Sequence, residues 1–345
     1  MNSFLMKSWL LKFFIFVIFL CPLTAYTQDA TSSTTPGLPF HYDTTSYPGT
    51  LKPLERIQPF DTARNRKRMR MVTASHILAY PTSMAALYFG WYKKYPQTRF
   101  HFFNDNHQWK QVDKVGHAYS AYIESYASME LWRWAGASRS QRVWIGGLSG
   151  AVYQTIFETL DGFSDGWGWS WGDFAANAAG SGILVGQELA WKEQRIHFKF
   201  SAHGKNYADP ELNKHTVKIY GQSWQERIVK DYNGQTYWLS VNLKSFMKES
   251  SLPSWLSVAF GYGADGMFGA AYNAYTDELG NMTFNRSDIA RYRQYYIAPD
   301  IDLTKIRTKN RLLKLALGAL NVVKFPLPSI EYNSKQQFKF HLLHF

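Results

Sequence analysis

The sequence predicts an α+β protein, with an N-terminal helical bundle of about four apolar, small-residue-rich helices and a β-rich C-terminal region that contains one short amphipathic helix. Two observations carry this prediction. Long apolar stretches rich in Gly, Ala and Ser lie between residues 69 and 200, whereas short segments after Phe200 have the alternation or composition of strands. We therefore expect a signal peptide at 1–28, a polar linker at 29–68, a helical bundle at 69–200 and a β-rich region at 201–345.

The first 28 residues have the layout of a secretory signal peptide. Lys7 and Lys12 give it a positive start, residues 13–20 form an unbroken apolar run, and residues 23–25 offer a small-residue cleavage site. An uncleaved N-terminal anchor is the alternative. We expect the protein to be exported and to work in the periplasm or at the outer membrane, associated with a membrane.

Cys21 is the only cysteine in the chain. A lipid-modified cysteine follows a small residue, and Leu20 is large. We therefore expect Cys21 to leave with the signal peptide. The mature chain would then have no thiol, which excludes disulfides, zinc–thiolate sites and a cysteine nucleophile.

The charge and aromatic content favour a membrane partner. The formal net charge is +12, and removal of Lys7 and Lys12 leaves +10. Export makes membrane lipid or envelope proteins better partners for a basic chain than nucleic acid, so we expect no nucleic acid. Aromatic residues make up 17% of the chain, which is typical either of a membrane interface or of a large aromatic core. The oligomeric state stays open.

The first helix of the expected bundle follows a basic run at 64–70. Residues 71–91 carry no formal charge and are long enough to span a bilayer, although Pro81 would kink such a helix. A buried core helix is the competing interpretation. The basic run would be a solvated helix start in one case and a juxtamembrane cluster in the other.

Three further helices are expected at 113–134, 142–160 and 170–191. Asp113 is a candidate N-cap, and Ser170 with Asp173 has the spacing of a capping box. The small residues of these segments allow close helix contacts, as in bundles in or beside membranes.

The C-terminal region holds four expected strands and one helix. The strands are at 237–243, 255–262, 295–303 and 338–345, and the amphipathic helix is at 310–324. We expect a small sheet, either soluble or at a membrane edge.

A set of polar residues is expected to gather at one end of the bundle. Asp113 and His117 are four residues apart, as are Asp173 and Asn177, so each pair lies on one helix face. In an antiparallel bundle with short loops, the end of the third helix meets the starts of the second and fourth. The whole predicted cluster is Asp113, Lys114, His117, Glu158, Asp161, Ser170, Asp173 and Asn177.

Three interpretations of this cluster stay open. The residues can serve as helix caps and satisfy one another's hydrogen bonds. His117, Glu158, Asp161 and Asp173 can form a hydrolytic site, or hold a divalent metal ion through carboxylate oxygens and one imidazole. The same pocket can recognise a lipid headgroup. No cofactor other than such a metal is expected.

These motifs resemble a known family. Asp113-Lys114-x-x-His117, Glu158-x-x-Asp161-Gly162 and Ser170-x-x-Asp173-x-x-x-Asn177 are similar to the YfiM-like bacterial envelope proteins, predicted periplasmic lipoproteins of unknown function. The first of these motifs, Asp113-Lys114-x-x-His117, and the last, Ser170-x-x-Asp173-x-x-x-Asn177, are more distantly similar to the VanZ-like membrane domain. The resemblance covers about residues 70–190 and implies a helical envelope domain with no established reaction.

The leading hypothesis is a non-enzymatic cell-envelope protein, associated with a membrane, that binds lipid or protein partners. The alternative is a hydrolase that acts on an envelope lipid or glycan through His117, Glu158, Asp161 and Asp173.

Overall fold

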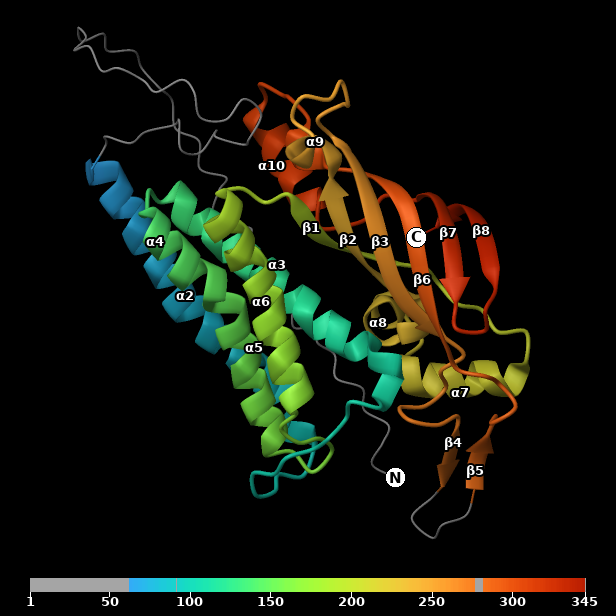
Figure 1. Cartoon of the computed structure of the whole chain (residues 1–345). Coiled ribbons are helices and arrows are strands. Elements are labelled where there is room, and N and C mark those ends of the chain that lie inside the picture. Colours follow the sequence, from blue (N-terminus) through green and yellow to red (C-terminus); the bar gives the residue numbers. More distant parts are fainter. Residues whose placement is uncertain (1–61, 91, 277–281, 345) are drawn as a thin grey trace, which may run out of the picture.

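The computed structural model describes residues 62–90, 92–276 and 282–344 (Figure 1). It confirms the mixed class, with helices in the N-terminal half and a sheet-rich C-terminal region. The expected signal peptide at 1–28, Cys21 and residues 29–61 of the expected linker lie outside the described residues.

The N-terminal half consists of α2 (Thr62–Gly90), α3 (Val112–Trp134), α5 (Gly147–Gly162) and α6 (Trp171–Trp191). The short helix α4 (Arg139–Gln141) and a π-helical turn (Arg142–Gly146) lead into α5. Helix α2 begins before residue 69, so residues 62–68 of the predicted linker are helical. The basic run therefore continues the helix, because its long side chains favour helical backbone.

Helices α3, α5 and α6 pack closely because glycines sit at their crossings. A Cβ added to Gly180 of α6 would lie 1.9 Å from the Ala118 carbonyl oxygen of α3, and one added to Gly150 of α5 would lie 2.1 Å from the Ala121 carbonyl oxygen. Helix α2 contacts the others through buried apolar residues such as Val72 and Leu87. Polar pairs add to these contacts: His76 Nε2 is 2.8 Å from Ser128 Oγ, and Ser83 Oγ is 2.6 Å from Tyr153 OH. A regular four-helix bundle stays a prediction.

The C-terminal region is built on an antiparallel sheet with strand order β1-β2-β3-β6-β7-β8. Its strands are β1 (Ile196–Ala202), β2 (Gln235–Asn242), β3 (Leu256–Asp265), β6 (Tyr292–Ile301), β7 (Leu327–Asn333) and β8 (Phe338–His344). A second pair is β4 (Ala274–Thr276) with β5 (Met282–Asn285), and the helices are α7 (Pro210–Tyr220), α8 (Trp224–Lys230), α9 (Leu243–Phe246) and α10 (Arg311–Leu320).

Two features of this region differ from the prediction. Strand β1 begins at Ile196, so the boundary at residue 200 cuts through a strand. The region also holds α7, α8 and α9 besides the one amphipathic helix predicted. Helix α7 has a plain start signal that the prediction missed, since Asp209 caps it and Pro210 is its first residue.

Helix α3 lies between the helices α2, α5 and α6 and the sheet (Figure 1). Tyr119 and Tyr122 of α3 pack against Phe198 of β1, and the Tyr119 hydroxyl donates to the Val322 carbonyl at 3.0 Å. The two halves therefore share one core.

One face of the sheet carries apolar side chains, which α3 covers at β1 and which are exposed beyond it, and the other face is buried and holds many polar side chains beside Trp238 and Tyr296. One row on the exposed face runs through Leu239, Phe260, Ile297, Ile330 and Phe340, which are paired in register across five strands and are 39–69% exposed. The opposite face carries side chains that are almost fully buried, among them Lys199, Thr236, Ser240, Asp300, Glu331 and His344.

The sheet curls around this polar face. His344 Nε2 of β8 is 3.2 Å from Thr236 Oγ1 of β2. In a flat sheet with a spacing of about 4.8 Å per strand, these two strands would lie about 19 Å apart. The apolar face is therefore the convex one.

Across the part of the chain that the structure describes, no helix is both long and apolar enough to cross a membrane.

The close approach of α6 to α3 at Gly180 leads to a prediction about helix packing. Gly180→Ala should destabilise the protein by at least about 1–3 kcal/mol, because the new methyl group meets backbone and the helices must separate. The matched control is Gly182→Ala in the same helix, where an added Cβ meets nothing within 4 Å, and this change should stabilise by about 0.5–1 kcal/mol. Urea unfolding of both variants measures the two effects. Equal stabilities would contradict the close crossing.

His344 makes the curled sheet sensitive to acid. Burial, followed by the nearby His203 and His341, lowers the pKa of His344 to about 3. Because this lies below the unfolded value of about 6.5, the folded state binds fewer protons than the unfolded one. The stability that the neutral ring contributes is present above pH 6.5 and is lost as the pH falls toward 3.

The change His344→Phe should therefore reduce the loss of stability between about pH 7.5 and pH 5 by roughly 2 kcal/mol. Chemical denaturation at both pH values measures it. An unchanged pH dependence would show that another group causes the acid sensitivity.

Candidate functional site

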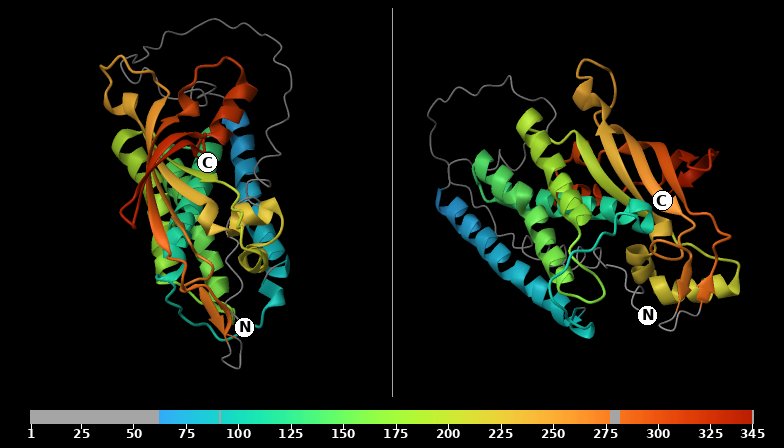
Figure 2. Two further views of the ribbon diagram at one scale, coloured as in Figure 1. Left: turned by 90° about the vertical axis from the view of Figure 1, so that its right-hand side faces the viewer. Right: turned by 60° about the horizontal axis from the view of Figure 1, so that its bottom comes forward.

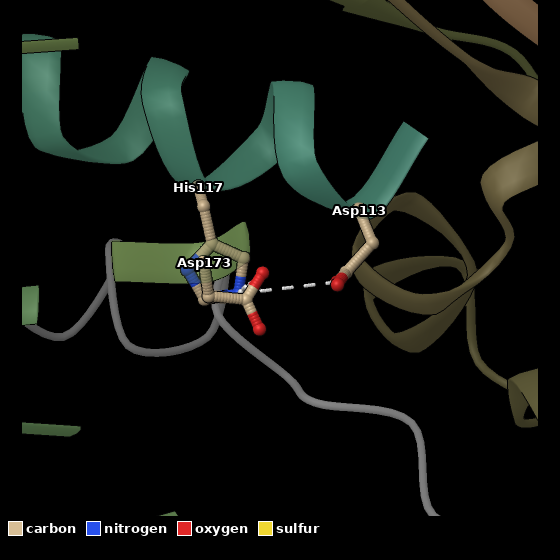
Figure 3. A group of neighbouring side chains, drawn as sticks. All are labelled: Asp113, His117 and Asp173. Atoms are coloured by element: carbon tan, nitrogen blue, oxygen red, sulfur yellow. Dashed lines mark ion pairs between the residues drawn. The ribbon is translucent and has the colours of Figure 1, made fainter. Parts of the chain in front are cut away.

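The predicted polar residues lie where the start of α3, the end of α5 and the start of α6 approach one another. Ser170 caps α6, because its hydroxyl accepts from the Asp173 amide at 3.2 Å. This cap fixes the first turn of α6, from which Asp173 and Asn177 face α3. Figure 3 shows Asp113 and His117 on α3 facing Asp173.

Lys114 is the cation at the centre of the group. Its Nζ is 2.6 Å from Asp105 Oδ1, 2.7 Å from Asp173 Oδ1 and 3.4 Å from Asp113 Oδ2. The lysine side chain is 13% exposed, and all three carboxylates are buried. In an interior of low polarity such ion pairs are strong, and the loss of one partner leaves a charge that is costly to bury.

His117 is fully buried between carboxylates on its two sides. Its Nε2 is 3.5 Å from Asp173 Oδ1 and 4.0 Å from Asp113 Oδ1. Its Nδ1 is 3.3 Å from Asn177 Oδ1 and 3.7 Å from Glu158 Oε1. With oxygens beside both nitrogens, the ring can donate to both sides only as imidazolium.

Asp161 and Ser170 join the group through other residues. The Tyr92 hydroxyl donates to Asp161 Oδ1 at 2.7 Å, and the Ser170 hydroxyl donates to Asp105 Oδ1 at 2.6 Å. Asp161 thus lies against the segment that follows α2, and Ser170 lies against the loop before α3.

Sequence reasoning missed three members of the group, namely Tyr92, Asp105 and Tyr232. The Tyr232 hydroxyl donates to Asp113 Oδ1 at 2.6 Å from 119 residues further along the chain. Asp105 reaches the group because its loop runs beside residues 162–169, where the Phe103 amide donates to the Trp169 carbonyl at 2.8 Å. No local spacing in the sequence marks these contacts.

Two predicted capping roles are wrong. Asp113 is the second residue of α3, and Gln111 takes the N-cap position without a side-chain cap. Ser170 caps α6 as predicted, but the Asp173 carboxylate bonds to Lys114 rather than completing a capping box. In both cases Lys114 binds the carboxylate, together with Tyr232 at Asp113, and the local helix end does not.

The backbone just before Asp113 is strained. Trp109, Lys110 and Gln111 have φ values of 48°, 49° and 67°, which side-chain-bearing residues rarely adopt. The C-terminal region holds them there: the Trp109 amide donates to the Ala270 carbonyl at 2.7 Å, and the Tyr262 hydroxyl donates to the Lys110 carbonyl. The position of Asp113 therefore depends on the sheet region.

Residues 101–186 match a family model described as "Predicted periplasmic lipoprotein (DUF2279)". The matched span contains all eight residues of the predicted cluster and Asp105. It covers 86 of the 345 residues and supports an exported, periplasmic, membrane-associated location without assigning a reaction. Comparisons of the chain with curated proteins and with solved structures give no match.

The family description names a lipoprotein, whereas we expect Cys21 to be removed with the signal peptide and not to carry lipid. Cys21 lies outside both the matched span and the described residues. The resemblance to the YfiM-like and VanZ-like proteins stays a prediction.

Among the described residues, Asp113, His117 and Asp173 form a group that could hold a metal ion (Figure 3). One possible ligand atom from each residue lies within 4.8 Å of the other two. Two carboxylates and one imidazole suit a divalent ion such as Mn²⁺ or Zn²⁺. The Lys114 ammonium, however, already contacts both aspartates. A metal ion here would have to compete with that charge.

Lys114→Met should lower the free energy of unfolding by about 3–5 kcal/mol, because three buried carboxylates lose their shared cation. Urea unfolding followed by tryptophan fluorescence measures this. Lys214→Met, at an exposed position of α7, is the control and should have little effect. We also expect Mn²⁺ to raise the melting temperature of Lys114→Met and not that of the wild type. Stabilisation of the wild type by Mn²⁺ would show that the centre is a metal site.

Proposed function

We propose that the chain is a non-enzymatic envelope protein that binds membrane lipid through the outer faces of its helices and of its sheet. The observation that carries the proposal is the distribution of charge on α5 and α6: their charged groups are buried, and their outer faces are uncharged. In this view the buried cluster maintains the fold and performs no chemistry.

The outer faces of α5 and α6 consist of uncharged residues. From residue 144 to 163, the exposed positions are Trp144, Ile145, Leu148, Val152, Ile156, Thr159 and Phe163. On α6 they are Trp171, Phe174, Leu189 and small residues, whereas Asp173 and Glu188 are buried. A soluble surface normally mixes both signs of charge, so a continuous uncharged face indicates a partner that is itself apolar.

Helix α2 continues this surface. Its positions from 71 to 89 carry no formal charge, and Ile77, Leu78 and Phe89 are 63–66% exposed. At about 1.5 Å per residue, these stretches are close to 30 Å long, the thickness of the hydrocarbon core of a bilayer.

The convex face of the sheet is also suited to contact with membrane lipid. Its apolar row from Leu239 to Phe340 is flanked by Tyr262, Tyr295 and Tyr332, which pair in register. Tyrosine suits the boundary between acyl chains and headgroups. A convex face offers no cavity for a small ligand, whereas fluid acyl chains adapt to any shape.

The resemblance to YfiM-like envelope proteins and to the VanZ-like membrane domain agrees with contact with lipid. A hydrolase that uses His117, Glu158, Asp161 and Asp173 has less support. These side chains are at most 1% exposed, so a substrate would have to open the helix contacts to reach them.

The proposal predicts that charge on the outer face prevents membrane binding. Val152→Lys with Ile156→Lys should reduce the fraction that floats with phosphatidylcholine vesicles by more than tenfold, because a lysine within the hydrocarbon costs roughly 2.5–3.5 kcal/mol. Circular dichroism should show an unchanged fold, since both positions are 42–59% exposed.

The matched control places the same two charges on polar surface, as Asn213→Lys with Gln222→Lys, and should float like the wild type. If Val152→Lys with Ile156→Lys also floats like the wild type, lipid does not contact this face.

A further inference from the structure

Helix α10 exposes leucines that nothing in the described structure covers. Leu312, Leu315 and Leu320 are 73%, 54% and 52% exposed. The helix is nevertheless firmly placed. The Asn310 side chain accepts from the Leu312 and Leu313 amides at its start, and after its end the chain pairs with β1, where the Phe200 amide donates to the Val322 carbonyl at 3.0 Å. An anchored helix with outward leucines presents a docking surface.

The segment that carries α10 is strongly basic. Residues 303–330 contain Lys305, Arg307, Lys309, Arg311, Lys314 and Lys324 and no acidic residue. Arg307 and Lys309 are exposed just before the helix, beside its leucines. Burial lowers the pKa of Lys314 within the helix. Leucines next to cations are typical of a helix that lies in a membrane interface.

Other cations and apolar side chains extend this surface. The start of α2 lies toward the same end of the molecule as α10 in Figure 1 and in the left view of Figure 2, and it exposes Arg66, Lys67 and Arg70. Trp255 is 40% exposed and adjoins the segment before α10, because its carbonyl accepts from the Asp302 amide at 2.8 Å.

We propose that this end of the molecule, formed by residues 303–320 with the start of α2, docks on anionic lipid headgroups at a bilayer surface. The leucines of α10 enter the acyl chains just below the headgroups, and the cations pair with lipid phosphates. The inference rests on the proposed lipid binding for its choice of partner. It adds selectivity for anionic lipid and fixes which end of the molecule meets the headgroups.

The test compares binding of the full chain to vesicles of phosphatidylcholine and to vesicles that also contain phosphatidylglycerol. The wild type should bind the anionic vesicles more tightly, and added salt should reduce the difference. Arg307→Gln with Lys309→Gln should weaken binding to anionic vesicles by roughly 25-fold, since each cation near such a surface contributes about 1 kcal/mol. Binding to neutral vesicles should change little.

The control is Lys214→Gln with Lys218→Gln on α7, which removes the same charge elsewhere and should keep the preference. A second variant, Leu312→Ser with Leu315→Ser, should weaken binding to both kinds of vesicle.

Results other than those expected would contradict either this inference or the proposed function. Equal binding of the wild type to both vesicles overturns this inference and leaves the proposed function standing, whereas no binding to either contradicts the proposed function. A preference lost only in the α7 control places the anionic-lipid surface elsewhere. A dimer that Leu312→Ser with Leu315→Ser dissociates, with no vesicle preference, would make α10 a contact between two copies.

Discussion

The ion pairs of Lys114 with its aspartates hold together elements that the sequence separates widely. Asp105 comes from the loop before α3, Asp113 from α3 itself and Asp173 from α6. Asp113 also accepts from Tyr232 of the sheet region, which extends the network to the second half of the chain. Since these charges are buried, every member must be in place for the others to be tolerated. Just before this network, Trp109, Lys110 and Gln111 have left-handed backbone angles.

The burial of charged side chains affects which side chains lie on the surface of the protein. In a protein of ordinary polarity, apolar side chains fill the core and charged ones face water. Here Glu124, Glu158 and Glu188 are buried among the helices, and Lys199 and Asp300 form a buried pair 2.8 Å apart on the concave side of the sheet. The same helices and strands bury apolar residues such as Tyr119 and Phe157, while others, such as Val152 and Phe260, lie on the surface. The two halves follow one rule, although their secondary structures differ.

Local pattern was enough to predict the long helices, the approximate positions of β2, β3, β6 and β8, and the approach of the helix ends that carry His117 and Asp173. It failed where a distant partner decides. Asp113 looks like an N-cap by its position, yet Lys114 and Tyr232 occupy its carboxylate. Strand β1 was missed although Phe198 and Phe200 alternate with His197 and Lys199, which is typical of a strand, and the structure buries all four side chains. Contacts such as Tyr92 with Asp161 depend on tertiary packing, which no spacing in the sequence encodes.

The distribution of residues along α2 links the two proposed lipid contacts. The helix starts with exposed Arg66, Lys67 and Arg70, continues without formal charge to residue 89 and ends with exposed Tyr88 and Phe89. Cations suit headgroup phosphates, apolar residues suit acyl chains, and aromatic rings suit the boundary between the two, so a helix that lies against lipid can present all three. Helix α10 lies toward the basic end of α2 (Figure 1), and the exposed Phe102 and Trp171 stack at the start of α6. Cations and exposed apolar side chains thus occur together in α2 and in the segment of α10, which are more than 200 residues apart in the sequence. This is expected if both segments contact one membrane surface.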